Sequence, residues 1–358
     1  MATMAYRQKE SEAVLRAWTA GQSVSVVGVG SAGKSNFVSH LASSGSLSGP
    51  AVHWPDDLVP VVLDANMLGP LPGSSERGRD AIAFWAGCEL LLHRTFMALY
   101  SFDRFTEQER ATLYQAYEAL QDGTNPLFAQ LALRYLELGL SVPFHAGLRL
   151  AFIFDEFERF AALLPVGFFQ SLRGLRDMHK RRLTYTSVTR TALLYVMHAA
   201  GIDALQSEPF VELFNDQVVY LGPYASEDAV AMIQDLFGRR GMALNASVVA
   251  ALLVVTGGHA GLLRTSVHCV LDHPALGRLS NRDLSPTLLA YPSVEQECAA
   301  IWFSLGPDEQ DVLQSLFKGR QPENPGAAFV LQQKGLAGRK LQIQPPLFAA
   351  FLARQASS

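Results

Sequence analysis

Residues 24–35 read Val-Ser-Val-Val-Gly-Val-Gly-Ser-Ala-Gly-Lys-Ser, and no other part of the chain is as informative about its fold. Its apolar start predicts a short buried strand, and the residues after it have the spacing Gly28-x4-Gly33-Lys34-Ser35. Glycines at such positions let backbone N–H groups converge on phosphate oxygens, and the following helix presents its positive N-terminal dipole to them. The alternative is an ordinary glycine turn, but four positions of fixed residue type at fixed offsets seldom arise by chance. The stretch predicts a strand, a phosphate-binding loop and a helix.

This pattern is that of a P-loop, which binds a nucleoside triphosphate together with magnesium. Lys34 would neutralise the β- and γ-phosphates, and the hydroxyl of Ser35 would be a ligand of Mg²⁺, which prefers hard oxygen ligands. The sequence shows no guanine-reading Asn/Thr-Lys-x-Asp motif, so ATP is the expected nucleotide, although adenine is not established over guanine. We expect the nucleotide to be bound by the loop and the first turn of the helix: Gly28, Gly30, Ser31, Ala32, Gly33, Lys34, Ser35 and Asn36.

The second half of the predicted site is the run Leu150-Ala-Phe-Ile-Phe-Asp155-Glu156-Phe157. Its apolar part predicts a central parallel strand that is buried on both faces, and ligands bind at the carboxyl ends of such strands. The run resembles a Walker B motif, in which Asp155 would hold magnesium and Glu156 would polarise the attacking water as general base. The alternative is an acidic helix cap after a core strand. The prediction depends on both motifs meeting around one Mg-triphosphate.

The composition limits the class of protein. A chain of 358 residues with 49% apolar and 17% charged residues predicts two or three domains with sizeable cores. The polar N-terminus and the lack of an apolar run of about 18 residues favour a cytoplasmic protein without a membrane partner. The net charge of -4 argues against a broadly basic nucleic-acid surface. Three widely spaced cysteines and nine histidines without metal-binding spacing indicate neither a disulfide framework nor a zinc site.

Further periodic stretches predict a P-loop NTPase fold of the α/β class, with a parallel sheet flanked by helices. A proline at position 60 places its strand at an edge of that sheet. The additional strands are expected at Leu58–Asp64, Leu183–Arg190 and Gln217–Pro223, and the helices at 7–20, three times between 80 and 138, and at 165–179. A surface loop is expected at Ser43–Pro50.

The remainder of the chain is predicted to be helical. Ser226 is expected to cap a helix, and a turn-rich stretch from His273 to Pro292 is expected to separate two helical groups. The expected helical segments are 248–255, 262–271, 295–305, 308–317 and 326–334, followed by a hairpin-like wing at 336–343. The predicted domains are a P-loop ATPase domain at 1–222, an α-helical lid at 223–290 and a small winged-helix domain at 291–358.

These parts occur in the order found in STAND ATPases and the related origin-recognition-type AAA+ ATPases, and the chain resembles that group over essentially its whole length. The resemblance implies that Thr189 and Arg190 sense the γ-phosphate, which makes Arg190 a catalytic candidate beside Lys34 and Glu156. The segment Thr256–Arg264 is similar to the family's lid motif, with Ala260 in place of the family's proline, and it implies a nucleotide contact by Arg264. Solvated arginines and a plain interhelical turn are the alternatives.

Two functions from different classes follow from this resemblance. In the first, the chain is a STAND-type switch in which ATP binding and hydrolysis control closure of the lid and winged module, with a protein partner or a second copy of the chain. In the second, it is a DNA-acting ATPase of initiator or loader type. Residues 295–358 hold six basic and six acidic side chains, so the charge does not favour nucleic acid. A third possibility is a scaffold that binds ATP with little turnover.

Overall fold

The computed structural model describes residues 6–43, 54–73, 76, 78–122, 125 and 127–356. The chain divides into two compact units. Unit 1 consists of Met1–Glu10, Val27–Phe37 and Tyr220–Ser358, and unit 2 consists of Ser11–Val26 and Val38–Val219. Beyond Ser43, the loop expected at 43–50 lies outside the described residues.

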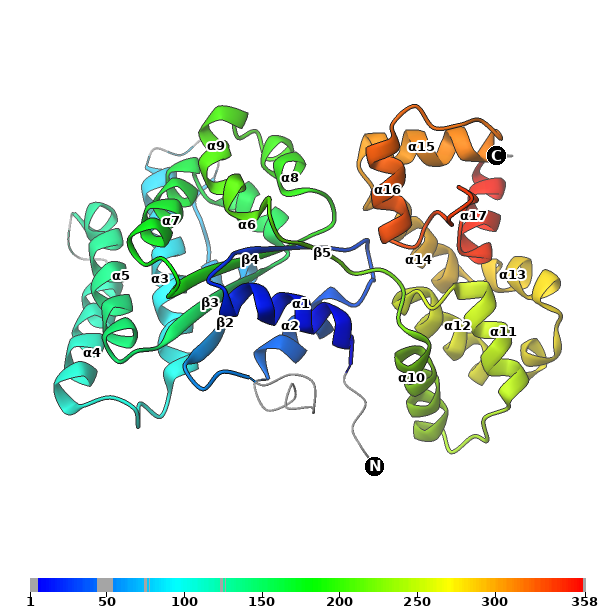
Figure 1. Ribbon diagram of the computed structural model, residues 1–358, viewed down its shortest axis with the longest axis horizontal. Helices are drawn as coiled ribbons and strands as arrows, with labels where there is room; N and C mark the ends of the chain where they lie inside the picture. The colour runs from blue at the N-terminus through cyan, green and yellow to red at the C-terminus, as the bar shows by residue number, and fades with distance from the viewer. Residues whose placement is uncertain are drawn as a thin grey trace. The chain divides into compact units, whose positions relative to one another are not determined.

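Unit 2 is built on a five-stranded parallel sheet with the order β2-β3-β4-β1-β5 (Figure 1). All five strands were predicted, and β2 lies at an edge as Pro60 indicated, because a proline has no N–H to donate to a neighbouring strand. The register of β2 on β3 runs from Leu58 opposite Arg149 to Asp64 opposite Asp155. The strands are β1 (Val24–Val27), β2 (Leu58–Asp64), β3 (Arg149–Asp155), β4 (Leu183–Thr189) and β5 (Val218–Tyr220).

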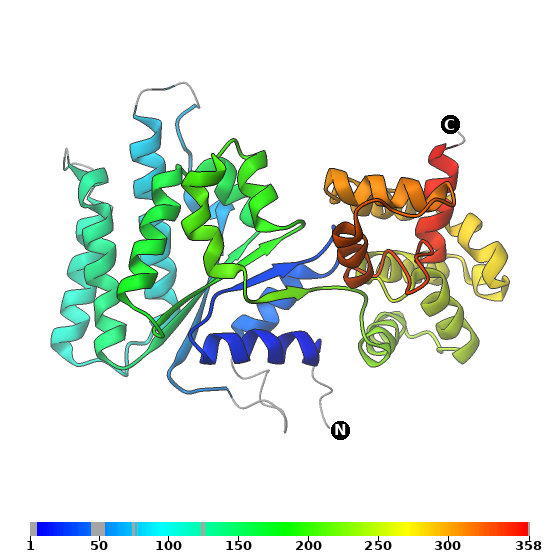
Figure 2. The same cartoon turned by 45° about the horizontal axis from the view of Figure 1, so that its top comes forward.

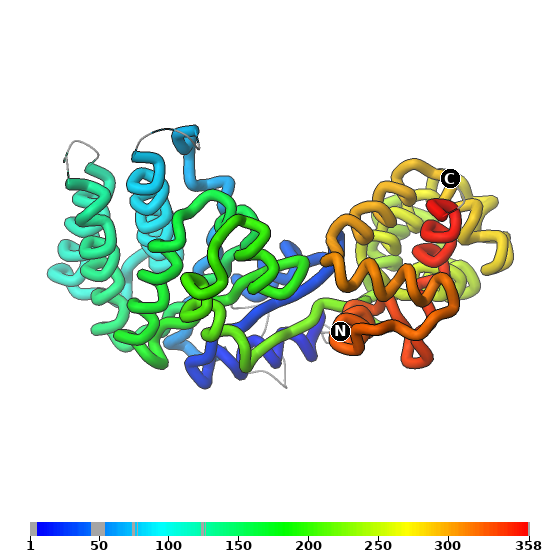
Figure 3. The backbone as a smooth tube through the Cα atoms, turned by 90° about the horizontal axis from the view of Figure 1, so that it is seen from above, coloured from blue at the N-terminus to red at the C-terminus, as the bar shows by residue number. Residues whose placement is uncertain are grey.

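Helices cover both faces of this sheet. Helices α1 and α2 lie on one side, and α6 to α9 lie on the other (Figures 1 and 2). Helices α3, α4 and α5 run side by side (Figure 3), and α3 packs on β2. The bounds are α1 (Gln8–Thr19), α2 (Lys34–Ala42), η1 (Ala65–Leu68), α3 (Arg79–Leu99), α4 (Glu107–Gln121), α5 (Phe128–His145), α6 (Phe157–Leu163), α7 (Val166–Met178), α8 (Leu193–Ala199), α9 (Ala204–Val211) and η2 (Glu212–Phe214).

Aromatic packing fixes the carboxyl end of β3. Phe154, the residue before Asp155, is buried and lies with its ring centroid 5.2 Å from that of Phe160 on α6. Phe157 stacks on Phe210 of α9 at 5.9 Å. Offset and edge-on aromatic pairs contribute about 0.5–1.5 kcal/mol beyond their buried area. The strand end that carries Asp155 is therefore held by a rigid apolar cluster.

Buried hydroxyl groups join β1, β4 and helix α1 in the middle of the sheet. Ser23 accepts the backbone N–H of Tyr185 at 3.1 Å, and the indole of Trp18 donates to Thr186 at 2.8 Å. These bonds satisfy polar groups of Ser23 and Thr186 in the centre of the sheet, whereas Oγ1 of Thr184 on the same strand is buried without a hydrogen-bond partner among the described residues.

Helix α3 has a largely apolar sequence. Among the described residues it is the one helix that is long and apolar enough to cross a membrane. Half of its most apolar 18-residue stretch, 50%, is buried in the fold. It packs against β2 and α5, so its apolar face is used within unit 2.

Unit 1 is helical outside the P-loop segment. One apolar cluster contains Val29 and Ala32 of the P-loop together with buried residues of the helices after β5. The P-loop therefore shares its core with the C-terminal part of the chain. The helices are α10 (Ser226–Arg239), α11 (Ala246–Thr256), α12 (Ala260–Asp272), η3 (Pro274–Arg278), α13 (Asn281–Leu289), α14 (Pro292–Phe303), α15 (Pro307–Phe317), α16 (Pro325–Gln333) and α17 (Pro346–Ala356).

Three expectations for this half of the chain were wrong or incomplete. Ser226 is the first helical residue of α10 and does not cap it, because Ala225 occupies the N-cap position. The stretch expected to be turn-rich contains α13, which begins after the capping residue Ser280 and includes Pro286. Its prolines were taken as turn signals, yet buried leucines on one face hold the helix in the core. The expected wing has one antiparallel bridge, Ala337 to Ile343, and α17 follows it.

Candidate functional site

The P-loop connects β1 to α2 in a strained turn. Ser31 and Gly33 have positive φ angles of 57° and 84°. Such left-handed residues turn neighbouring backbone N–H groups into a common concavity, which is the geometry of an anion-binding nest. Glycine is required at position 33, because a Cβ there would also lie 3.0 Å from the hydroxyl of Tyr224. A serine in this conformation at position 31 costs about 1–3 kcal/mol, and such strain often accompanies function.

Lys34 is folded back over the loop. Its Nζ donates to the carbonyl oxygens of Gly28 and Val29, both at 2.8 Å. The ammonium group therefore adds its positive charge to the N-terminal end of α2, where the helix dipole is also positive. Ser35 and Asn36 are exposed in the first turn of this helix.

A buried arginine supports the loop from behind. The guanidinium of Arg7 is almost fully buried, and its Nη2 donates to the carbonyl of Ala32 at 2.8 Å and to that of Gly222 at 3.0 Å. It also lies 4.6 Å from the ring centroid of Tyr224. Arg7 was not predicted as a site residue. Its position just ahead of the first helix was the only signal available.

The predicted lid motif reaches the P-loop within unit 1. The backbone N–H of Gly261 donates to the carbonyl of Ser31 at 3.0 Å. A Cβ at position 261 would lie 2.5 Å from that of Ser31, so glycine is required there. Arg264, one helical turn further along α12, is exposed and pairs with the carboxylate of Glu297 on α14 at 3.4 Å.

The acidic pair predicted as Walker B lies at the carboxyl end of β3 in unit 2. The backbone N–H of Glu156 donates to Oδ1 of Asp155 at 3.0 Å, which orients that carboxylate. Glu156 itself has left-handed φ and ψ angles of 52° and 53° at the start of α6. Its side chain is about half exposed and pairs with Arg159 at 3.6 Å. A second strained non-glycine residue thus lies at a predicted catalytic position.

The predicted sensor pair ends the neighbouring strand β4. Thr189 is buried, and its hydroxyl donates to the carbonyl of Thr191 at 2.7 Å. Arg190 is exposed, and its backbone N–H donates to a carboxylate oxygen of Glu158 at 2.6 Å. Since β3 and β4 are parallel neighbours, Thr189 and Asp155 end their strands at the same edge of the sheet.

A third carboxylate lies at this edge and was not predicted as a site residue. Asp64 ends β2 directly opposite Asp155 in the register of the sheet. It accepts the backbone N–H and the side-chain amide of Asn66, both at 2.8 Å, and so caps η1. The acidic end of the predicted strand Leu58–Asp64 was the signal that could have identified it.

No family model matches the chain, and no curated protein matches it. Solved structures do, among them the Walker-type ATPase PABY2304 of Pyrococcus abyssi, with a TM-score of 0.54 and 14% identity over 98% of this chain and 96% of that one. The chain has the fold of a Walker-type ATPase.

Other structures of this kind superpose less well. Orc1 of Aeropyrum pernix in complex with DNA gives a TM-score of 0.42 at 13% identity and covers 100% of this chain and 84% of that one. Cdc6p of Pyrobaculum aerophilum gives 0.43 at 12% identity, with 98% and 84% covered. At TM-scores below 0.5 these two likenesses carry no conclusion about this chain.

The donor atoms of the predicted metal site suit magnesium. The described residues hold no group of three or more His, Cys, Asp or Glu side chains that could bind a metal ion by themselves. Mg²⁺ in a Walker-type site does not need one, because it takes one or two protein oxygens together with phosphate and water oxygens. The exposed hydroxyl of Ser35 in unit 1 and the carboxylate of Asp155 in unit 2 are each an oxygen donor of this kind.

A buried histidine in the lid motif makes the stability depend on pH. His259 is 1% exposed, and its Nε2 donates to the carbonyl of Lys334 at 3.1 Å. Burial lowers the pKa of its imidazole to about 4. Between about pH 6.5 and 4 the unfolded chain binds a proton that the folded chain does not, so the free energy of unfolding falls as the pH falls.

We expect a loss of about 2 kcal/mol between pH 7 and pH 5 from this group. Chemical denaturation at both values should show it in the wild type and show it reduced in His259→Gln, whose amide can still donate to Lys334. The exposed His198 supplies the control His198→Gln, which should keep the wild-type pH dependence. Equal pH dependence in His259→Gln and wild type would contradict the assignment.

Proposed function

We propose that this chain binds Mg-ATP at the P-loop and hydrolyses it. The observation that carries the proposal is the conformation of the loop after β1: a left-handed, glycine-dependent turn that ends in a lysine and a serine at the start of a helix. In that turn Lys34 Nζ lies over the loop. A structural turn requires neither this lysine nor the strained Ser31.

Each residue has a task that follows from its chemistry. Lys34 would leave its two loop carbonyls and neutralise the β- and γ-phosphates, while loop amides bind phosphate oxygens. Ser35 and Asp155 would hold the metal ion. When bound, Mg²⁺ supplies positive charge to the phosphate oxygens and lowers the cost of bringing the nucleophile near them. Arg7 would keep the loop in shape through Ala32.

Glu156 is the proposed general base. Its backbone conformation is strained and its carboxylate is half exposed, so it can accept a proton from a water molecule once it leaves Arg159. Arg190 would stabilise the charge that develops on the transferred phosphoryl group. Titration of Mg-ATP into the protein by calorimetry tests the binding step directly, and absence of heat at any accessible concentration would end the proposal.

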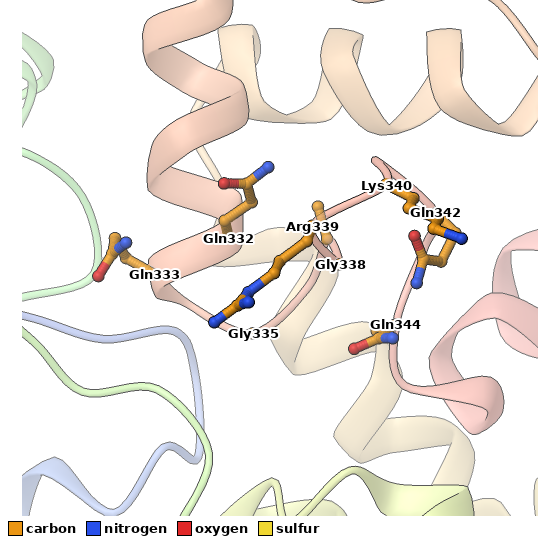
Figure 4. Close-up of a pocket in the computed structure, with 9 residues that line it drawn as sticks. Gln332, Gln333, Gly335, Gly338, Arg339, Lys340, Gln342 and Gln344 are labelled. Carbon is orange, nitrogen blue, oxygen red and sulfur yellow. The ribbon is translucent and has the colours of Figure 1, made fainter.

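A second candidate concerns what the ATPase acts on, and one observation favours DNA. A cavity of about 680 Å³ is lined by Arg339, Lys340 and four glutamine side chains from α16 and the loop after it. In Figure 4 Arg339 extends toward Gly335, away from Lys340. Guanidinium, ammonium and amide groups are those with which proteins contact phosphates and base edges. These basic and amide side chains support the initiator or loader type of ATPase over the STAND-type switch. The feature that supports the switch is the apolar core that the P-loop shares with the C-terminal helices.

We expect the double variant Arg339→Ala/Lys340→Ala to weaken binding of a fluorescently labelled duplex and to reduce the slope of log affinity against log salt by about 1 to 2. Fluorescence anisotropy at several salt concentrations measures both. Lys318→Ala/Arg320→Ala removes the same charge elsewhere in the same unit and is the control. Duplex binding that is absent in the wild type, or equally weakened by both double variants, would favour the switch.

A further inference from the structure

Helix α14 and the residue after it contact the P-loop through Ser304. The Oγ of Ser304 accepts the backbone N–H of Gly30 at 2.8 Å. The serine hydroxyl donates its own hydrogen to the carbonyl of Ile301 at 2.7 Å, so a lone pair of the oxygen faces the loop. Ser304 is 4% exposed. A P-loop amide is thus already bound to an oxygen of the protein.

The backbone of α14 approaches the same glycine. A Cβ at Gly30 would lie 2.6 Å from the carbonyl oxygen of Ala300. Gly30 has no positive φ, so it is this contact that excludes a side chain there. Ala300 lies in the last turn of α14, where the carbonyl groups lack intrahelical donors and carry the negative end of the helix dipole. The negative end of a helix therefore points at the loop.

Glu297, one turn earlier on α14, adds a carboxylate. Its Oε2 is buried and has no hydrogen-bond partner among the described residues. The same oxygen would lie 2.5 Å from a Cβ at Gly261, the residue whose N–H binds the carbonyl of Ser31. Its Oε1 pairs with Arg264. A buried carboxylate oxygen without a donor is unfavourable, so packing alone does not account for a glutamate here.

We infer that Glu297, Ala300 and Ser304, here named the α14 clasp, form a built-in brake on nucleotide binding. The inference rests on the proposed function of the P-loop. The clasp presents three electronegative oxygens to a loop that is shaped to receive phosphate oxygens. While Gly30 donates to Ser304, that N–H is not available to a phosphate, and while Arg264 pairs with Glu297 it is not available to the nucleotide. Phosphate and clasp also repel each other, so they exclude one another.

The expected change in nucleotide affinity depends on how often the clasp is open. The apparent dissociation constant equals the intrinsic constant divided by the fraction of molecules in which the clasp is open. Removing one hydrogen bond of ordinary strength shifts such an equilibrium by about three- to tenfold. Ser304→Ala and Glu297→Gln should therefore each tighten Mg-ATP binding by about three- to tenfold, and the double variant should bind more tightly than either.

Calorimetric titration of the full chain with Mg-ATP measures these constants. Ser285→Ala removes another buried hydroxyl of unit 1, and Glu295→Gln removes a carboxylate on α14 that pairs with Arg354. Both controls should bind as the wild type does. Binding by Ser304→Ala and Glu297→Gln that equals the wild type or is weaker overturns the clasp, while nucleotide binding by the wild type would still support the proposed function.

Hydrogen exchange of the nucleotide-free protein tests the clasp independently of ATP. The Gly30 amide should exchange faster in Ser304→Ala than in wild type and Ser285→Ala. Mg-ATP should accelerate exchange in residues 300–305 of the wild type. If no variant binds nucleotide, the proposed function fails, and unchanged exchange at Gly30 in Ser304→Ala would separately refute the clasp.

Discussion

Lys34→Ala is expected to abolish the stabilisation that Mg-ATP gives to this protein. At a nucleotide concentration one hundred times the dissociation constant, the wild type gains about 2.7 kcal/mol in the free energy of unfolding. The variant loses the ammonium group that would bind the β- and γ-phosphates, so it should gain close to nothing. Thermal unfolding with and without Mg-ATP measures the difference, and calorimetry should show no saturable heat.

The same variant also changes the protein without nucleotide. Lys34 donates to two carbonyls of its own loop, and each such bond contributes about 0.5–1.5 kcal/mol, so a modest loss of stability is expected. The comparison must therefore be of nucleotide-dependent shifts. Lys9→Ala, which removes an exposed lysine of α1, should show the full wild-type shift. A normal shift in Lys34→Ala would mean that the nucleotide binds elsewhere or not through this loop.

Glu156→Gln is expected to reduce phosphate release by about 10²- to 10⁴-fold, the usual contribution of a general base. The amide keeps the size of the side chain but cannot accept the proton of the attacking water. Binding of Mg-ATP should remain within a few fold of wild type, because Glu156 is not assigned a phosphate contact. Single-turnover hydrolysis together with calorimetry separates the two effects.

Two control variants show whether a loss of turnover is specific to the carboxylate of Glu156. Arg159→Ala removes the exposed partner of Glu156, and since exposed ion pairs contribute about 0–1 kcal/mol, turnover should change by only a few fold. Glu212→Gln removes an exposed carboxylate of the same unit that also pairs with an arginine, and it should be silent. Equal turnover in Glu156→Gln and wild type would transfer the role of base to another residue, with Asp64 as the first to examine.

The sheet could be predicted from the sequence because its strands have local signatures. The apolar run before Asp155, the β-branched strand before Thr189 and the proline of β2 each specify a strand or its place without reference to distant residues. Helix α13 could not be predicted in this way, because its prolines resemble turn signals and only packing of its leucines against other helices favours the helix. The prediction that Ser226 caps α10 was wrong by one residue. The position at which a helix begins depends on backbone angles, and the residue type does not fix them.

The candidate site could likewise be predicted where its residues form a local pattern, and not where they meet through tertiary contacts. The types and spacing from Gly28 to Ser35 carry the phosphate chemistry, so no tertiary information was needed. The contacts of Arg7 and Ser304 depend on tertiary structure: Arg7 contacts a loop 25 residues later, and Ser304 one 274 residues earlier. Nothing in the local sequence of a buried serine indicates that its oxygen binds a P-loop amide. The assigned roles of Glu156, Arg190 and Arg264 remain predictions.

The composition of unit 1 from three separate chain segments has a practical consequence for dissecting this protein. The chain passes from one unit to the other after Glu10, Val26, Phe37 and Val219. A C-terminal truncation near Val219 would thus leave the phosphate-binding turn attached to the sheet but strip away the helices with which Val29 and Ala32 form their core. No single cut yields either unit intact, and a shortened fragment that fails to bind nucleotide would say nothing about the full-length chain.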